Sequence, residues 1–424
     1  MTGAAMDVDA LLSSLDGTAD RIEAALQDEA PSAGVWDELD KRNHGTDEEP
    51  EWRPVNSLRN LVTILERDPR WTGKLQICDF RRVALVNGEP VTSVDHLEVK
   101  LWVARVYGYE PGTERTLEGM AVVSHRNRVH PVREYLDALQ WDGRARVRRV
   151  LADLFSCIET DDGLTEAISL RWLVSAVARI YEPGCKVDPM LILQGPQGCR
   201  KSSGLKALTG AQWFSDTAIQ LGSKDAYLAL QGVWVYEFAE LEGMNRAEAN
   251  QVKNFLTSAV DKFRPPYGKV DETMPRQCVV AGTTNEQVFL HDRTGNRRSW
   301  VRRVRPGATV DVDGIARWRD QIWAESVHMY RAGEQWHLTD SEAAAHAADV
   351  QQYVHDDPWL ETAEGLLASR GMVRVTDVLD ALQLAPEHRN KGHEMRVTGL
   401  LGQLGAVPKG RRTVAGVRGF WWSR

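Results

Sequence analysis

The feature that most constrains this chain is the stretch LILQGPQGCRKSSGLKALTG, which occupies residues 191 to 210. An apolar run stops at a glycine-rich loop, and a helical pattern begins at the lysine that follows the loop. Backbone N–H groups of such a loop and of the helix amino terminus point at phosphate oxygens, and the helix dipole adds to the attraction. The stretch therefore predicts a strand, a phosphate-binding loop (P-loop) and a helix.

The residue types in this loop suggest how it binds a nucleotide. Lys201 is expected to reach the β and γ phosphates of ATP, and the Ser202 hydroxyl is expected to bind Mg²⁺. Arg200 stands where a glycine usually precedes the lysine, so either the backbone tolerates a side chain there or the site is impaired. A loop that binds nothing is the alternative. The candidate nucleotide-binding residues are Gly195, Pro196, Gln197, Gly198, Cys199, Arg200, Lys201, Ser202 and Ser203.

Two later apolar runs also end in polar residues. VWVYEFAEL (233 to 241) predicts a strand that ends at Glu237, whose carboxylate would hold Mg²⁺ through water or polarise the hydrolytic water. Glu240 is given a supporting role, with a solvated acid on a first helical turn as the alternative. CVVAGTTN (278 to 285) places Asn285 at another strand end, where its amide would orient the attacking water unless it is a turn asparagine.

Two adjacent arginines follow in HDRTGNRRSW (291 to 300). Arginine neutralises the charge that develops on a transferred phosphoryl group, often from a neighbouring subunit. Arg297 is the first candidate for this role and Arg298 the second. A surface pair that only balances charge is the alternative.

The wider pattern predicts an α/β P-loop NTPase core between a helical domain and a basic tail. Apolar residues recur at helical spacing before Tyr181, with one possible hairpin at 75 to 89. From Asp188 strands and helices alternate, which indicates a mainly parallel sheet covered on both faces, and helices return after Trp300. The expected domains are an acidic, flexible arm at 1–52, a mostly helical domain at 53–181, the ATPase domain with a helical lid at 182–356, and a winged-helix-like domain at 357–424.

The tail suggests a DNA reader. A short helix capped by Thr376, a second helix within 393–405 and a basic ribbon have the layout of a winged helix, with the second helix in the major groove. Phe420, Trp421 and Trp422 are expected to pack the ribbon against the helices. A small interaction domain with a basic face is the alternative. The candidate DNA contacts in the ribbon are Arg411, Arg412 and Arg418.

Charge is uneven along the chain, although its net value is −8. Residues 1–50 hold thirteen acids against three basic residues, whereas residues 386–424 hold eight basic residues against two acids. Such asymmetry suggests an anionic partner for the basic end. Five scattered cysteines fit reduced thiols better than disulfides or a metal site, and neither a membrane span nor a secretory signal is recognisable, so a cytoplasmic protein is expected.

The P-loop stretch, the strand ending at Glu237, DKFRPPYG, CVVAGTTN and DRTGNRRSW occur in an order that resembles the virulence-associated protein E family of P-loop ATPases. That family is similar to the superfamily 3 helicases of viruses and plasmids. The resemblance covers about residues 55 to 305, and it implies an AAA+-like core, a ring of usually six subunits, and ATP-driven DNA unwinding for a prophage, satellite or plasmid.

The resemblance also implies a hairpin that enters the ring channel at residues 262–277, where Lys262, Arg264, Lys269 and Arg276 would touch DNA phosphates. Lys269 is the first candidate for a channel contact, and Arg264 would alternatively face the nucleotide of the neighbouring subunit. An ordinary surface loop is the alternative for the whole segment. Priming would come from a separate primase or other replication protein. The sequence leaves two rivals open. One is a nucleotide-binding DNA scaffold or initiator without strong turnover, which the Arg200 substitution motivates, and the other is an anti-phage defence ATPase.

Overall fold

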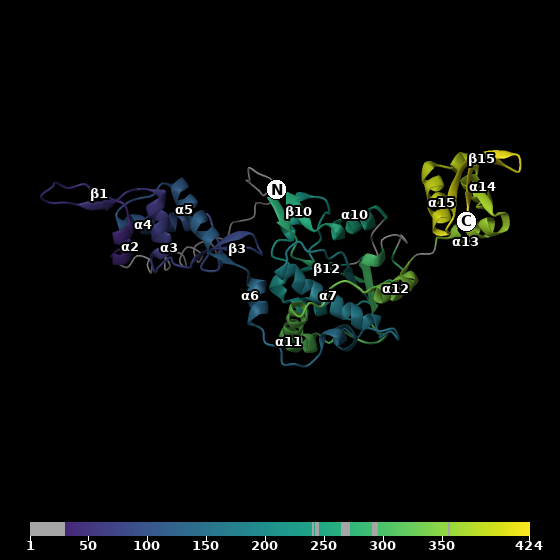
Figure 1. Cartoon of the computed structure of the whole chain (residues 1–424), viewed down its shortest axis with the longest axis horizontal. Coiled ribbons are helices and arrows are strands. Elements are labelled where there is room, and N and C mark those ends of the chain that lie inside the picture. Colours follow the sequence, from purple (N-terminus) through teal and green to yellow (C-terminus); the bar gives the residue numbers. More distant parts are fainter. Residues whose placement is uncertain (1–29, 240, 242–245, 264–271, 291–295, 355–356) are drawn as a thin grey trace, which may run out of the picture. The chain divides into compact units, whose positions relative to one another are not determined.

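The computed structural model describes residues 30–239, 241, 246–263, 272–290, 296–354 and 357–424 (Figure 1). The chain forms two compact units. Of the described residues, those up to Gln140 together with Tyr227–Val233 form the first unit, and those of Trp141–Ala226 and Trp234–Arg424 form the second. This division differs from the expected one, because residues 141–181 belong to the second unit.

The first unit combines helices with a small sheet. Helix α3 (Leu58–Arg67) begins after Ser57, whose side chain accepts a hydrogen bond from the Asn60 backbone N–H, and it buries Leu61, Ile64 and Leu65. The predicted hairpin is confirmed: β3 and β4 pair antiparallel within a four-stranded sheet of order β5-β4-β3-β6. The other elements are α2 (Ala33–Glu38), β1 (Lys41–Asn43), β2 (Trp52–Pro54), β3 (Leu75–Cys78), β4 (Val83–Val86), β5 (Glu89–Pro90), α4 (Asp95–Tyr107), α5 (Thr113–Arg126), β6 (Arg128–Val129) and α6 (Pro131–Ala138).

The second unit contains a five-stranded parallel sheet of order β13-β7-β12-β9-β8. Its strands are β7 (Met190–Gln194), β8 (Phe214–Ser215), β9 (Val235–Phe238), β12 (Val279–Thr284) and β13 (Ser299–Arg303). Every residue of β7, β9 and β12 is buried. Because successive side chains of a strand point to opposite faces, both faces of the sheet are covered, as the apolar runs predict.

Tryptophans tie helices to this sheet. The Trp172 indole N–H of α7 donates to the Val280 carbonyl of β12 at 3.2 Å, and the Trp234 indole N–H donates back to Ala176 of α7 at 2.9 Å. Trp323 of α11 donates to the Leu208 carbonyl of α8 at 2.8 Å. The helices of this part are α7 (Leu164–Tyr181), α8 (Lys201–Thr209), α9 (Lys224–Ala229), α10 (Arg246–Thr257), α11 (Val312–Arg331) and α12 (Asp340–Asp349), and short single turns lie at Val147–Arg149, Val150–Leu154, Ala211–Trp213, Asn296–Arg298 and Val350–Tyr353.

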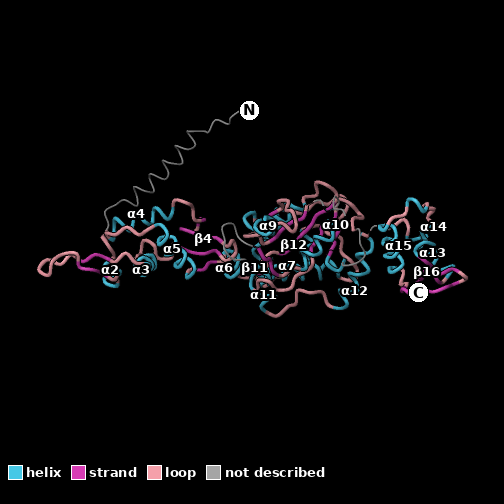
Figure 2. Tube along the Cα trace, turned by 90° about the horizontal axis from the view of Figure 1, so that it is seen from above, coloured by secondary structure: helices cyan, strands magenta, loops and turns pink. Residues whose placement is uncertain are grey.

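The C-terminal segment has its own apolar core, built from three helices and a three-stranded sheet of order β14-β16-β15 (Figure 2). Helix α14 begins at Val375, so the predicted Thr376 cap is wrong. The Asp377 carboxylate instead accepts the Arg374 backbone N–H at 2.8 Å. The elements are α13 (Leu360–Arg370), β14 (Met372–Arg374), α14 (Val375–Ala381), a turn at Pro386–His388, α15 (Lys391–Gln403), β15 (Val407–Val414) and β16 (Val417–Ser423).

All five cysteines are free thiols. Within the described ranges, no helix has both the length and the apolar character that a membrane span requires.

Candidate active site

Three neighbouring strands of the parallel sheet bring the predicted residues together. β12 pairs with β7 on one side and β9 on the other, and all three run in the same direction. The loop 195–200 follows β7, Asn285 follows β12, and Glu237 lies near the end of β9. Ligands of open parallel sheets bind outside the carboxyl ends of the strands, so these residues occupy the edge where a substrate is expected.

The Lys201 ammonium group joins the loop to the Asn285 strand end. Lys201 lies at the start of α8 and is 8% exposed. Its Nζ donates to the Gly195 carbonyl at 2.7 Å, the Pro196 carbonyl at 3.1 Å and the Asn285 Oδ1 atom at 3.0 Å. An ammonium group has three donors, and here all three point to these oxygens. A phosphate must therefore replace at least one of these three oxygens to be bound by Lys201.

The backbone of the loop explains its glycines and shows which conformation Arg200 adopts. Gly195 has little room for a side chain, since a Cβ would lie 3.0 Å from the Cβ of Val304. Gly198 has φ of +83°, and Arg200 has φ of 66° and ψ of 29°. Both lie in the left-handed region that favours glycine. The backbone at Arg200 thus adopts the conformation of the missing glycine, at a cost of about 1 kcal/mol.

Glu237 is the buried carboxylate of the site. It is 0% exposed, and its Oε1 atom accepts from the Ser202 hydroxyl and the Thr283 hydroxyl, both at 2.7 Å. Its Oε2 atom has no hydrogen-bond partner among the described residues. Burial raises the pKa of Glu237 above its usual value, although the two hydroxyls and Lys201 act in the opposite direction. Glu237 also lines a pocket of about 310 Å³ between the segment that follows β8, strand β9 and helix α10.

The oxygen atoms around Glu237 fit Mg²⁺, a hard cation that prefers carboxylate, hydroxyl and water oxygens. The unpartnered Oε2 atom of Glu237 offers one such ligand, directly or through water. The Ser202 hydroxyl can donate its proton to Glu237 and still offer a lone pair to a cation. Mg²⁺ commonly takes only one or two protein carboxylates and completes its shell with phosphates and water.

The arginine pair lies at the other end of the sheet. Ser299 pairs with Met190 and Arg303 with Gln194, so Arg297 and Arg298 precede β13 at the amino edge. The length of β7 separates them from the Lys201 loop by roughly 13 Å. Within one chain, the structure therefore does not bring the arginines to the loop.

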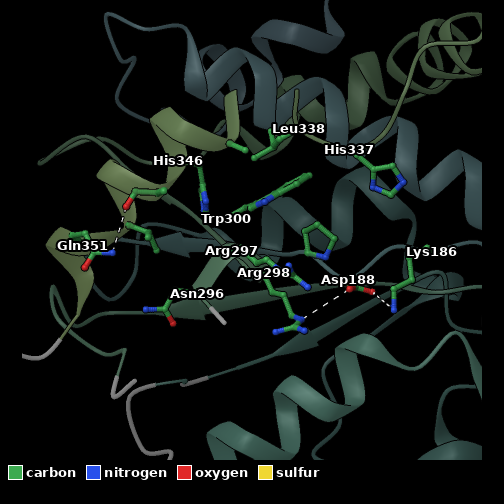
Figure 3. Close-up of a pocket in the computed structure, with 14 residues that line it drawn as sticks. Lys186, Asp188, Asn296, Arg297, Arg298, Trp300, His337, Leu338, His346 and Gln351 are labelled. Atoms are coloured by element: carbon green, nitrogen blue, oxygen red, sulfur yellow. Dashed lines mark hydrogen bonds and ion pairs between the residues drawn. The ribbon is translucent and has the colours of Figure 1, made fainter. Parts of the chain in front are cut away.

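Figure 3 shows the surroundings of the two arginines, a pocket of about 430 Å³. Arg297 is exposed, whereas Arg298 is 17% exposed and its Nε atom lies 4.0 Å from the Asp188 carboxylate. The His346 ring donates from Nε2 to the Ser299 carbonyl at 2.9 Å, and burial lowers the pKa of His346. Arg297 thus carries an accessible guanidinium, and Arg298 is partly neutralised.

A family model for the Virulence-associated protein E-like domain matches residues 136–356. This is the part of the chain that contains the parallel sheet and the residues described above. The chain belongs to this family. The match ends before the C-terminal segment that begins at residue 357.

Among solved structures, this family member is similar to several structures of the C-terminal region of NrS-1. One apo structure is 14% identical, with a TM-score of 0.40, and the similarity covers 68% of this chain and 77% of that chain. An apo structure of the A form is 13% identical, with a TM-score of 0.42, over 68% of this chain and 78% of that chain. No curated protein matches this chain.

Most of the remaining candidate site residues of this domain lie in or near two strands, β10 (Val260–Phe263) and β11 (Glu272–Pro275). These strands pair antiparallel, as a hairpin requires. Lys262 lies in β10, whereas Arg264, Lys269 and, elsewhere, Glu240 lie outside the described residues. Arg276 is not a DNA contact: it is 4% exposed, and its guanidinium pairs with both oxygens of Asp261. Its role is to hold the base of the hairpin.

The sequence interpretation missed Thr283. This residue is 6% exposed, and its hydroxyl shares the Oε1 atom of Glu237 with Ser202. The available signal was the pair of threonines, Thr283 and Thr284, that ends the otherwise apolar strand β12. Such a buried polar group needs a partner, and here the partner is the carboxylate on the neighbouring strand.

Proposed function

We propose that this protein is a Mg²⁺-dependent ATPase whose site lies at the carboxyl edge of the parallel sheet. The observation that carries the proposal is the pair of direct contacts Lys201–Asn285 and Ser202–Glu237, which link four residues predicted independently from three strand ends. The loop N–H groups and the amino end of α8 would bind the β and γ phosphates with Lys201. Bound Mg²⁺ would neutralise charge on the phosphate oxygens, held through Ser202 and Glu237.

Glu237 is suited to act on the attacking water. A carboxylate whose pKa is raised by burial is a stronger base than a solvated one. Its Oε2 atom is available to accept a proton or a water hydrogen. Asn285 would be released by Lys201 when the ammonium turns to the phosphates, and its amide would then orient the same water.

The arginines favour a shared site between subunits. Because Arg297 and Arg298 lie at the amino edge of the sheet, Arg297 reaches a γ phosphate only on a neighbouring copy. This arrangement requires a head-to-tail contact, and repeated head-to-tail contacts form a ring when the rotation between subunits closes. We propose a homo-oligomer, a hexamer by resemblance to superfamily 3 helicases.

We infer DNA as the polymer on which the ATPase acts, during replication of a prophage, satellite or plasmid. The basic C-terminal segment, with three helices and a β-ribbon, supports a winged-helix-like DNA-binding module. The activity proposed is that of a helicase or a replication-initiation ATPase. A scaffold without turnover would share the same DNA surfaces.

ATP hydrolysis, measured with and without single-stranded DNA, tests the proposal. The wild type is expected to hydrolyse ATP in the presence of Mg²⁺, and DNA is expected to increase the rate. Lys201→Ala should lower the rate at least about 100-fold, since the lysine contacts charge that develops in the transition state. Lys206→Ala, an exposed lysine on the same helix, serves as the control. Equal and negligible rates for wild type and variant would reject an ATPase and favour the scaffold.

A further inference from the structure

The three consecutive aromatic residues of β16 have different surroundings. Trp421 is 7% exposed, its indole N–H donates to the Arg412 carbonyl at 3.1 Å, and the Arg374 guanidinium lies over its ring at 5.3 Å. Trp422 packs against the apolar core of the C-terminal segment. Phe420 is 50% exposed. The expectation that all three pack against the helices is therefore wrong for Phe420.

Phe420 lies beyond the body of this segment. β14 pairs with β16 only at Trp421, Trp422 and Ser423, so the ribbon from Phe420 to its turn is two-stranded. Figure 1 shows this ribbon, in yellow, extending past the helices α14 and α15. The Phe420 ring lies beside the Trp422 ring, with centroids 6.4 Å apart, and its remaining surface faces solvent.

The pairing register places basic residues on the same face as Phe420. Arg411 lies directly opposite Phe420, and Thr413 lies opposite Arg418. Opposite residues of an antiparallel pair share a face, and residues two apart on one strand do as well. One face of the ribbon therefore carries Arg411, Arg418, Thr413 and Phe420, and all four are exposed.

Arg412 belongs to the other face of the ribbon. It pairs with Gly419, and its guanidinium donates to the Lys409 carbonyl at 2.8 Å. A Cβ at Gly419 would lie 2.6 Å from the Arg374 side chain, so that face is covered near its base. From residue 407 to the end the chain holds Lys409, Arg411, Arg412, Arg418 and Arg424 and no acid. The ribbon is thus uniformly basic, with its single exposed ring on one defined face.

We propose that the Arg411–Arg418–Phe420 face binds a single-stranded nucleic acid, with Phe420 stacked on an unpaired base and the two arginines on flanking phosphates. An exposed aromatic ring beside two basic side chains is the combination that binds unpaired strands without sequence preference. A duplex offers the arginines its phosphates but keeps its bases stacked on one another. The proposal deepens the inferred DNA partner, and it does not depend on nucleotide hydrolysis.

Affinity measurements without nucleotide test this face in the full-length protein. Fluorescence anisotropy with labelled oligo(dT), oligo(rU) and a blunt duplex should show that Phe420→Ala loses about tenfold affinity for the single strands and little for the duplex. Phe420→Trp should retain affinity, whereas Phe420→Leu should lose it because an aliphatic side chain cannot stack. Val417→Ala, which truncates another exposed apolar residue on the other face, should leave both affinities unchanged.

The salt dependence of binding separates the arginine–phosphate contacts from the stacking of Phe420 on a base. Arg411→Ala and Arg418→Ala should each reduce the slope of log affinity against log salt by about 0.7 for a single strand. Phe420→Ala should leave the slope unchanged, since it contacts no phosphate.

Photocrosslinking detects contact at residue 420 directly, even where another part of the protein contributes most of the affinity for nucleic acid. An oligonucleotide containing 5-iodouracil should crosslink at residue 420 in wild type and in Lys201→Ala, and excess blunt duplex should not compete. Absence of a crosslink at residue 420, or an equal loss of single-strand and duplex affinity in Phe420→Ala, would overturn the proposal. Binding of an acidic protein surface, with no nucleic acid bound, would also overturn it. Because Lys201→Ala is included, failure here is distinguishable from failure of the ATPase.

Discussion

Arg200 is the residue at which the sequence and the backbone disagree, since an arginine occupies a left-handed conformation. The structure shows that the loop keeps the shape that a glycine would give it. We expect Arg200→Gly to be more stable than Arg200→Ala by about 1 kcal/mol, because both remove the side chain but only glycine relieves the backbone. Urea unfolding of the two variants measures this difference. Equal stability, or a more stable alanine variant, would contradict the left-handed assignment.

Glu237 links the chemistry of the site to its stability. The pKa of Glu237 is higher in the folded protein than in the unfolded chain, so the ionised carboxylate disfavours the folded state. The contribution of Glu237 to stability therefore falls as the pH rises from the pKa of the unfolded chain through the pKa of the folded protein. Glu237→Gln should therefore raise Tm near pH 7 and lose this advantage below about pH 4.5. The same change should lower the hydrolysis rate roughly 100- to 1,000-fold without preventing nucleotide binding.

Thermal unfolding over a pH series and a hydrolysis assay check both parts of this prediction. Glu361→Gln, an exposed acid in α13, should leave Tm and rate unchanged. A Glu237→Gln protein that is less stable than wild type near pH 7 would show that the carboxylate stabilises the site rather than strains it.

Among the contacts that hold secondary-structure elements together, those of Arg276 fix the base of the β10–β11 hairpin. Its guanidinium is buried, pairs with Asp261 and lies over the Phe255 ring at 4.1 Å, while its carbonyl accepts from Arg179 of α7 at 3.1 Å. Arg276→Ala leaves a buried carboxylate without its partner, so we expect a loss of about 3–5 kcal/mol in the free energy of unfolding. Denaturant unfolding should show a much smaller loss for the exposed Arg317→Ala. Recovery of most of the loss in Arg276→Met with Asp261→Leu would confirm that the unpaired charge is the cause.

The elements also show what the sequence can and cannot predict. β7, β9 and β12 were predicted because buried parallel strands form uninterrupted apolar runs, and their order along the chain placed Lys201, Glu237 and Asn285 at strand ends. β13 was missed because its sequence SWVRR contains buried Arg302, which pairs with Asp349 from a distant helix. Partners so far apart along the chain, like the Thr283–Glu237 contact, leave no local pattern. The exposure of Phe420 was missed for a similar reason, since the pairing partner β14 is too short to cover it.

At the level of the whole molecule, Arg297 and the Lys201 loop lie at opposite edges of the sheet. This separation predicts how the subunits assemble. If Arg297 acts on a neighbouring copy, each shared site takes Lys201 from one subunit and Arg297 from the next. Lys201→Ala and Arg297→Ala should then each be inactive alone, although each variant keeps the residue that the other lacks. Random mixing of the two variants should restore about a quarter of the wild-type ATPase rate, because about a quarter of the subunit contacts then combine an intact loop with an intact arginine. Mixing either variant with Arg298→Ala provides a comparison, since Arg298 is partly neutralised by Asp188. If the mixture of Lys201→Ala and Arg297→Ala recovers no ATPase activity, Arg297 does not act in a site shared between subunits.

The central claim, that the Lys201 loop binds a nucleoside triphosphate with Mg²⁺, is tested most directly by calorimetric titration of the protein with a non-hydrolysable ATP analogue and Mg²⁺. We predict saturable binding by the wild type and by Lys206→Ala, and loss of binding in Lys201→Ala. An absence of binding to the wild type at millimolar analogue, or equal binding by Lys201→Ala, would contradict the claim.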